Sequence, residues 1–463
     1  MAGRAATDAI IKGRCAISVN DPGHPLPTGW SRAPLTDVAD LGTGHTPSRH
    51  EPNYWDGDIP WIGIRDAGAN HGKVINDTAQ HVTELGLDNS AAVLLPKNTV
   101  CLSRTASVGY VVKMGRDMAT SQDFVNWTCS ETIDPDYLLN ALLAEGEDIR
   151  RFGEGSTHTT IYFPEVKAFH IDLPPAAEQR RIVAKLDALT ARIARARAEL
   201  DRVAALASSL RFAALREAYQ IASAYRISEL GDLIETLDQG WSPKCENYPS
   251  SNDDEWAVLK TTAIQAMAYQ SGENKVLPLD LQPRAHIEVR AGDILVTRAG
   301  PRVRCGVTCL VETTRPRLML ADKMYRLRCT GEVSPAFLAF MLNSPQALER
   351  IEAMKTGISD SGLNLTQGKF FALELPAPSI DVQNRIVDGL RTAFARADRM
   401  EAEAARARKL LDRLEQAILA KAFRGELVPQ DPNDEPASVL LERIRAERAK
   451  APKPKRGRRK ASV

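Results

Sequence analysis

Two segments of the chain carry apolar residues at alternating spacings of four and three positions. One follows Pro174 and Pro175, and the other follows Pro376 and Pro378. A repeat of 3.5 residues is the period of a coiled-coil seam, whereas an ordinary surface helix repeats every 3.6 residues. The expected seam positions are Ile182, Leu186, Leu189, Ile193, Leu200 and Val203 in the first segment, and Ile386, Leu390, Met400, Leu411, Leu414 and Ile418 in the second.

The two segments are predicted to be long helices that pair with each other. Each could run for roughly 40 residues, or about 60 Å at 1.5 Å per residue. The prolines before each segment suit a first helical turn and prevent the helix from extending backwards. A lone helix of this length would expose its whole apolar stripe, so an antiparallel pair is favoured. The alternative is two independent amphipathic helices, each packed on its own domain.

The two segments end two copies of one longer pattern. Gln179-Arg-Arg-Ile-Val and Gln383-Asn-Arg-Ile-Val stand 204 residues apart. Earlier in each copy, Val100-Cys-Leu-Ser-Arg104 matches Ile294-Leu-Val-Thr-Arg298 at an offset of 194 for the arginines. Several matches in one order at nearly constant offset indicate an internal duplication.

Each copy is expected to hold a globular unit of about 150 residues in which short strands and helices are mixed. The expected fold class is therefore a mixed α/β protein of two repeats, with two globular domains separated by two long antiparallel coiled-coil helices and related by a pseudo-twofold axis. The expected divisions are an N-terminal extension (1–26), a first domain (27–175), its helix (176–220), a second domain (221–378), its helix (379–428) and a C-terminal segment with a short helix and a basic disordered tail (429–463).

Composition is that of an ordinary globular protein, with 43% apolar and 26% charged residues. The seven cysteines are few and scattered, which favours a reducing compartment, and no stretch is apolar enough to span a membrane. A cytoplasmic protein without membrane contact is expected. The eight histidines show no metal-ligand spacing, so no metal site is expected. No phosphate-binding loop, dinucleotide fingerprint or hydrolase motif occurs either, and nothing reads as an active site.

Several strings resemble the specificity subunit of type I restriction–modification systems. They are Leu26-Pro-Thr-Gly-Trp30, Gly42-Thr-Gly-His-Thr-Pro47, Tyr54-Trp-Asp-Gly-Asp-Ile-Pro-Trp61, Leu173-Pro-Pro-x-x-Glu-Gln-x-x-Ile-Val183 and Ile418-Leu-Ala-Lys-Ala-Phe-Arg-Gly-Glu-Leu427. The resemblance covers residues from about 26 to about 428. The second copy departs from it, because Trp241-Ser-Pro replaces Gly-His-Thr-Pro and the Asp-Gly-Asp-Ile-Pro-Trp string is lost.

The resemblance implies a protein that is not itself an enzyme. Each globular domain would be a target recognition domain that reads one half of a split, asymmetric site in double-stranded DNA through the major groove. The helices would set the gap and dock two methyltransferase subunits. Those partners would bring S-adenosylmethionine, restriction subunits would bring ATP and magnesium, and this chain would bind no cofactor.

Charge only partly fits DNA binding. Residues 27–175 carry 11 basic and 20 acidic side chains, and residues 227–375 carry 16 and 19. A lone DNA-binding protein is usually more basic, so partner subunits are expected to neutralise much of the phosphate charge. The candidate DNA-contacting residues are Arg104, Thr105, Thr157, His158 and Thr160 in the first copy, and Trp241, Lys244, Arg298, Arg302, Arg304 and Asn364 in the second.

Two other classes remain open at this point. One is a stand-alone DNA-binding protein with a regulatory or structural role, which co-purification with a methyltransferase subunit would distinguish. The other is an enzyme with an unrecognised site, which assays of the isolated chain would reveal.

Overall fold

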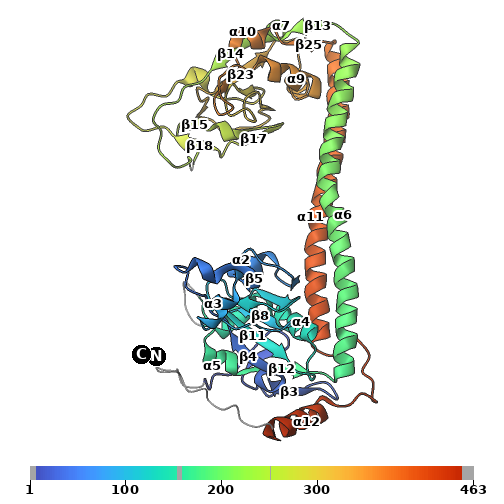
Figure 1. Ribbon diagram of the computed structural model, residues 1–463. Coiled ribbons are helices and arrows are strands. Elements are labelled where there is room, and N and C mark those ends of the chain that lie inside the picture. The colour runs from blue at the N-terminus through green and yellow to red at the C-terminus, as the bar shows by residue number, and fades with distance from the viewer. Residues whose placement is uncertain (1–6, 154–158, 251, 451–463) are drawn as a thin grey trace. The chain divides into compact units, whose positions relative to one another are not determined.

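The computed structural model describes residues 7–153, 159–250 and 252–450 (Figure 1). The chain divides into two compact units. The first unit combines the chain up to Ala198 with the chain from Arg408 onward, and the second is Glu199–Ala407. Each unit therefore holds one globular domain together with parts of both long helices. The predicted basic tail lies outside the described residues.

The first unit is built from short strands and helices. Its strands are β1 (Ile11–Lys12), β2 (Ile17–Val19), β3 (Ser31–Pro34), β4 (Ala39–Thr43), β5 (Trp55–Ile62), β6 (Val74–Ile75), β7 (His81–Val82), β8 (Val100–Ser103), β9 (Val111–Met114), β10 (Ala119–Thr120), β11 (Phe124–Cys129) and β12 (Phe169–Leu173). Its shorter helices are α1 (Leu35–Val38), α2 (Ile64–Ala69), α3 (Glu84–Asp88), α4 (Pro135–Glu145), α5 (Phe163–Lys167) and α12 (Ala437–Lys450).

The main sheet of the first domain has the order β4-β11-β8-β9-β6. Every residue of β8 and β9 is buried, which explains why these strands read as nearly continuous apolar runs. A smaller sheet, β10-β5-β7, lies beside it, and β12 joins β3 in a third. The core gathers the large rings of Trp127, Tyr137 and Phe169.

The second unit repeats this plan. Its strands are β13 (Ile227–Glu229), β14 (Ile234–Gln239), β15 (Ala257–Leu259), β16 (Ile264–Gln265), β17 (Ala268–Tyr269), β18 (Asn274–Val276), β19 (Ile294–Thr297), β20 (Ala299–Gly300), β21 (Thr308–Leu310), β22 (Leu318–Met319), β23 (Met324–Cys329), β24 (Leu363–Asn364) and β25 (Glu374–Pro376). Its shorter helices are α7 (Leu230–Leu233), α8 (Pro335–Leu342), α9 (Pro345–Met354) and α10 (Gln367–Phe371).

The duplication predicted from the sequence is confirmed by the strand order, apart from β6, which has no counterpart in the second main sheet. The order β14-β23-β19-β21 reproduces β4-β11-β8-β9, and β22-β15-β18 reproduces β10-β5-β7. The parallel pair of the smaller sheet recurs as well, with β10 beside β5 in one unit and β22 beside β15 in the other. The second copy thus keeps the strand β15 where the Asp-Gly-Asp-Ile-Pro-Trp string is absent.

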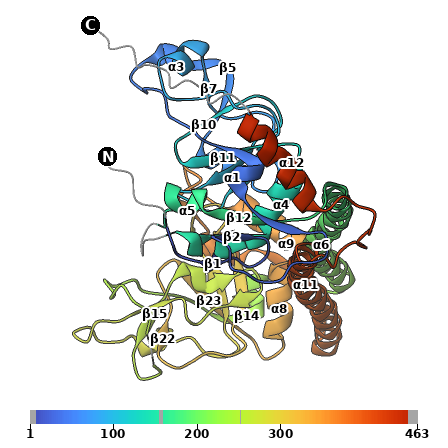
Figure 2. The same ribbon diagram turned by 90° about the horizontal axis from the view of Figure 1, so that it is seen from below.

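The two long helices are α6 (Ala176–Ser223), of 48 residues, and α11 (Ile380–Ala422), of 43. They lie side by side in both views (Figures 1 and 2). In the first unit the Arg197 guanidinium contacts Asp412 and Glu415 at 2.7 and 2.8 Å, while Arg181, nearer the start of α6, reaches Asp434 beyond the end of α11. The helices are therefore antiparallel, as predicted.

The same direction holds in the second unit. Arg211 contacts Asp398 at 2.5 Å and Glu401 at 2.7 Å, and the last turns of α6 face the first turns of α11.

Most of the expected seam positions are buried or partly buried. Ile182, Leu186, Ile193, Ile386 and Leu390 are buried, and Leu189, Leu200, Val203, Met400, Leu411 and Ile418 are intermediate. The prediction for Leu414 is wrong, because its side chain is 49% exposed. Leu411 and Ile418, which precede and follow Leu414 in the pattern, are both partly buried, so the seam continues past this position. Glu415, the residue after Leu414, is less exposed and binds Arg197 instead.

A buried glutamine fixes the start of each long helix to its domain. The Gln179 side chain donates from Nε2 to the carbonyls of Thr132 and Pro174 at 2.9 and 3.0 Å, and its Oε1 accepts from the Asp134 amide at 2.8 Å. Gln383 repeats all three bonds with Glu332, Pro378 and Ser334 at 3.1, 2.8 and 2.8 Å. The repeated Gln-x-Arg-Ile-Val string therefore marks a duplicated helix anchor.

The described part of the C-terminal segment packs on the first domain and on the start of α6. The Ala437 amide donates to the Gly29 carbonyl at 2.9 Å, and Arg445 pairs with Asp37 at 2.9 Å. Leu441 of α12 is buried in the same apolar cluster as Tyr137. Residues from late in the sequence therefore complete the apolar core of the first unit.

Candidate nucleic-acid interface

A loop after the first strand of each main sheet is built in the same way in both domains. Gly44 and Gly240 follow β4 and β14, and a Cβ at either position would meet backbone oxygens within 2.1–2.3 Å. The next residue, His45 or Trp241, donates its amide to the carbonyl of Thr120 or Leu320 at 2.9 Å.

The hydroxyl that comes next in the chain ties this loop to a second one. Thr46 donates to Gln122 Oε1 at 2.6 Å, and Ser242 donates to Asp322 Oδ1 at 2.7 Å. The two domains thus share this two-loop scaffold, while its exposed side chains differ.

The arginines at the ends of β8 and β19 occupy equivalent places. The Arg104 carbonyl accepts from the Ile161 amide at 3.0 Å, and the Arg298 carbonyl accepts from Leu365 at 2.7 Å. The guanidinium groups also donate to equivalent carbonyls, Arg104 to Gln122 at 3.1 Å and Arg298 to Asp322 at 2.8 Å.

Each of these guanidinium groups lies over a ring. Arg104 stands 4.8 Å from the centre of Phe163, and Arg298 stands 5.6 Å from that of Tyr325. Burial lowers the pKa of Arg104. Arg104 thus connects the loop at Gln122 to the segment 159–163, and Arg298 connects the loop at Asp322 to the segment 363–366.

Arg302 and Arg304, two of the predicted DNA-contacting residues, bind acceptor groups of the second domain. Arg302 pairs with Glu352 and, at 3.0 Å, with Asp360, and hydrogen bonds from Lys355 and Arg302 lower the pKa of Glu352. Arg304 donates to Gln265 Oε1 at 3.1 Å and to the carbonyls of Thr261 and Ile264. The sequence showed three neighbouring arginines but not the acceptors that surround two of them.

Some of the remaining predicted DNA-contacting residues form hydrogen bonds within their domain, and others lie at its surface. Thr105 donates to Asp123 Oδ1 at 2.6 Å, and Asn364 accepts from Arg298 at 3.0 Å, so that Arg298 and Asn364 are brought together. Thr160 is half-buried beside the segment that Arg104 holds, and Lys244 is exposed on the loop after β14. Thr157 and His158 lie outside the described residues.

Sequence reasoning missed two arginines that rest on tryptophan rings. Arg49 Cζ lies 4.9 Å from the ring centre of Trp55 and 5.7 Å from that of Trp61. Arg284 Cζ lies 4.2 Å from the ring centre of Trp241, which was itself predicted as a site residue. A tryptophan near a basic residue in a polar loop is a signal for Arg49, but 43 residues separate Arg284 from its ring.

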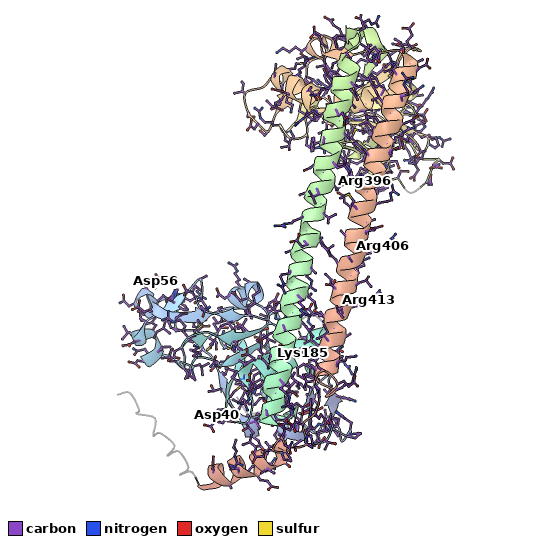
Figure 3. The ribbon with its side chains drawn as sticks, turned by 90° about the vertical axis from the view of Figure 1, so that its right-hand side faces the viewer. Asp40, Asp56, Lys185, Arg396, Arg406 and Arg413 are labelled. Atoms are coloured by element: carbon purple, nitrogen blue, oxygen red, sulfur yellow. The ribbon has the colours of Figure 1, made fainter. Side chains whose placement is uncertain are left out.

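A groove lies between the helices in the second unit. It has a volume of about 440 Å³ and is lined by Ala214, Glu217, Ala218, Ile221, Tyr225, Val382, Arg385, Ile386, Gly389, Leu390 and Ala393. Ile221 and Tyr225 are about half exposed there. Arg181 is the equivalent of Arg385 in the first unit, and it forms an ion pair with Asp434 of the C-terminal segment. Figure 3 shows further arginines, Arg396, Arg406 and Arg413, spaced along α11.

Within the described ranges, His, Cys, Asp and Glu side chains form no group of three or more that could hold a metal ion. Among the same residues, no helix has both the length and the apolar character needed to cross a membrane.

The fold and the paired scaffolds define a duplicated two-domain protein joined by an antiparallel helix pair. The sequence profile of the type I restriction modification DNA specificity domain matches residues 27–203. The EcoEI specificity subunit of Escherichia coli is 39% identical over 173 residues, which is 37% of this chain and 29% of that protein. The EcoKI specificity subunit of Escherichia coli K12 is 25% identical over 470 residues, covering 94% of this chain and 99% of that protein.

Two solved structures share the fold. The HsdS subunit of Thermoanaerobacter tengcongensis aligns with a TM-score of 0.57 at 20% identity, over 88% of this chain and 99% of its own. A chain from a study of complex assembly in the type I restriction–modification system aligns with a TM-score of 0.66 at 21% identity, over 87% of this chain and all of its own. Over residues 27–203 the chain is therefore similar to the type I restriction modification DNA specificity domain, and over 94% of its length it is similar to the EcoKI specificity subunit.

Proposed function

We propose that the two domains read the two halves of a split, asymmetric DNA site through the major groove. The observation that carries this proposal is the duplicated two-loop scaffold with different exposed side chains on each copy. Equivalent scaffolds can present equivalent surfaces to two DNA segments, and different side chains then select different bases. The major groove is the surface on which all four base pairs are distinguishable.

The long helices set the gap between the half-sites and dock two methyltransferase subunits. The half-exposed apolar groove lined by Ile221, Tyr225 and Arg385 supports docking, because an apolar patch with a charged rim is typical of a protein interface. The chain itself is not catalytic and binds no cofactor. S-adenosylmethionine is bound by the methyltransferase subunits, ATP and magnesium by restriction subunits, and the complex works in the cytoplasm.

The test is reconstitution with the methyltransferase subunits of the same system. The complex is incubated with a library of randomised duplexes, and the methylated positions are sequenced. A bipartite, asymmetric motif with an unread gap is expected, and the chain alone should transfer no methyl group. A continuous or symmetric motif would contradict recognition of a split site. Failure to co-purify with any methyltransferase subunit, together with specific DNA binding by the chain alone, would favour a stand-alone regulatory protein.

A further inference from the structure

Residues that distinguish the two half-sites must differ between the two domains. Gly44 and Gly240 share one geometry, and so do Arg104 and Arg298, down to the carbonyls that accept their hydrogen bonds. Such shared groups position the loops in both domains equally. Recognition of different half-sites therefore requires side chains that stand on this scaffold without being part of it, and that reach it from different places in the two domains.

Arg49 meets this requirement in the first domain. The two tryptophans below it hold both sides of its loop, because Trp61 Nε1 donates to the His45 carbonyl at 3.0 Å and Trp55 Nε1 donates to the Ser48 carbonyl at 3.1 Å. The two rings meet edge to face with centroids 5.3 Å apart. The guanidinium therefore rests on a platform that also fixes its backbone.

The charge of Arg49 is available to a ligand. The side chain is exposed, its Nη2 donates to the neutral Gln80 Oε1 at 3.3 Å, and no carboxylate pairs with it among the described residues. Arg302 shows the opposite arrangement, since two carboxylates neutralise it. A guanidinium oriented by a ring loses less side-chain freedom when it binds, and its remaining N–H groups keep their fork geometry.

The second domain brings a different arginine to the equivalent loop. Trp241 takes the place of His45, donating its amide to Leu320 as His45 does to Thr120. Arg284 arrives from a segment after β18, is exposed, and lies over the Trp241 ring at 4.2 Å, with no ion pair among the described side chains. The strands that precede these loops, β4 and β14, hold equivalent places in the two sheets (both are labelled in Figure 1).

We propose that Arg49 and Arg284 are specificity-determining residues of the two domains, and that each reads a guanine, at positions that differ between the half-sites because Arg49 lies on the loop itself and Arg284 comes from the segment after β18. Guanine presents two acceptors, N7 and O6, on its major-groove edge, and arginine donates to both at once. This inference rests on the proposed function. It assigns base reading to the ring-supported arginines and loop positioning to Arg104 and Arg298.

The experiment uses the full chain in the reconstituted complex and measures methylation rates over duplexes randomised at every position of both half-sites. Arg49→Ala should reduce discrimination at one position of one half-site by about 10- to 100-fold, as expected for loss of a bidentate contact, and leave the other half-site unchanged. Arg284→Ala should do the same in the other half-site only. Arg116→Ala and Arg290→Ala remove the same charge from exposed positions and should preserve discrimination in both.

A lysine at either position separates base reading from charge. Arg49→Lys keeps the cation but loses the fork, so it should discriminate as poorly as the alanine variant. A rate loss that is uniform over all sequences, in the lysine or the alanine variant, would mark a phosphate contact and overturn the assignment. Unchanged discrimination by Arg49→Ala in a complex whose parent is site-specific overturns this inference alone. A parent complex without a bipartite motif overturns the proposed function itself.

Discussion

Replacing the anchoring glutamine of α6 by leucine should destabilise the first unit by about 2–4 kcal/mol. Gln179 is 1% exposed, and leucine has a similar size but no polar atoms. The change removes three hydrogen bonds, each worth roughly 0.5–1.5 kcal/mol net, and leaves two carbonyls and one amide without that partner. Gln383→Leu should cost the second unit about as much, because its three bonds are equivalent.

Denaturant unfolding measures the loss in the free energy of unfolding, and hydrogen exchange shows which elements are destabilised. Gln179→Leu should accelerate exchange at the start of α4 (Pro135–Glu145), and Gln383→Leu at the start of α8 (Pro335–Leu342), each sparing the other. Gln220→Leu is the matched control, because Gln220 is an exposed glutamine of α6 and its loss should change stability by less than about 0.5 kcal/mol. A cost below about 1 kcal/mol for Gln179→Leu, with unchanged exchange in α4, would show that the helix is held by its apolar contacts alone.

Three other variants probe the helix pair, the shared loop and one ion pair. Inserting four residues after Ala196 lengthens α6 by about 6 Å and turns the remainder of the helix by about 40°. The complex should then lose its site or methylate a site whose gap has changed by at least one base pair. Activity on the original gap alone would show that the partner subunits, and not the helices, set the gap. Gly44→Ala forces a Cβ against backbone and should cost roughly 1–3 kcal/mol in denaturant unfolding, whereas Gly272→Ala, with nothing within 4 Å, should not. The hydrogen bond from Arg211 lowers the pKa of Glu401, so this pair stabilises the fold fully above the ordinary value of 4.5 and progressively less as the pH falls below it. Glu401→Gln should therefore melt below the parent at pH 7, and this difference should shrink as the pH is lowered below 4.5; a difference that stays constant with pH would contradict the ion pair.

The parts of the fold visible in the sequence are those set by periodicity and repetition. The 3.5-residue repeat predicted both long helices and their pairing, since a long apolar seam requires a partner. It failed at Leu414, whose side chain is exposed although Leu411 and Ile418 on either side of it are partly buried. The repeated Gln179 and Gln383 were visible as matching letters, but their role was not, because the carbonyls they bind are identified only by the folded backbone.

The candidate site was harder to predict because arginine has many uses. Arg302 and Arg304 look like a basic cluster in sequence, yet their acceptors come from segments 39 to 58 residues away. Arg49 and Arg284 gave no comparable signal, since one is isolated and the other meets its ring only through the tertiary fold. Local sequence shows where charge lies; which charges remain available depends on long-range contacts.

The C-terminal segment gives the protein an order of assembly during synthesis. The first domain leaves the ribosome early, but the Phe423 ring that packs 5.3 Å from Tyr137, and Leu441 of α12, belong to residues made much later. At roughly 5–20 residues per second, this delay is on the order of 10–50 s. The second unit, contained in Glu199–Ala407, can close before then. A chain that terminates before Phe423 therefore carries an uncovered apolar surface on its first domain, and this surface makes it a substrate for chaperones and proteases.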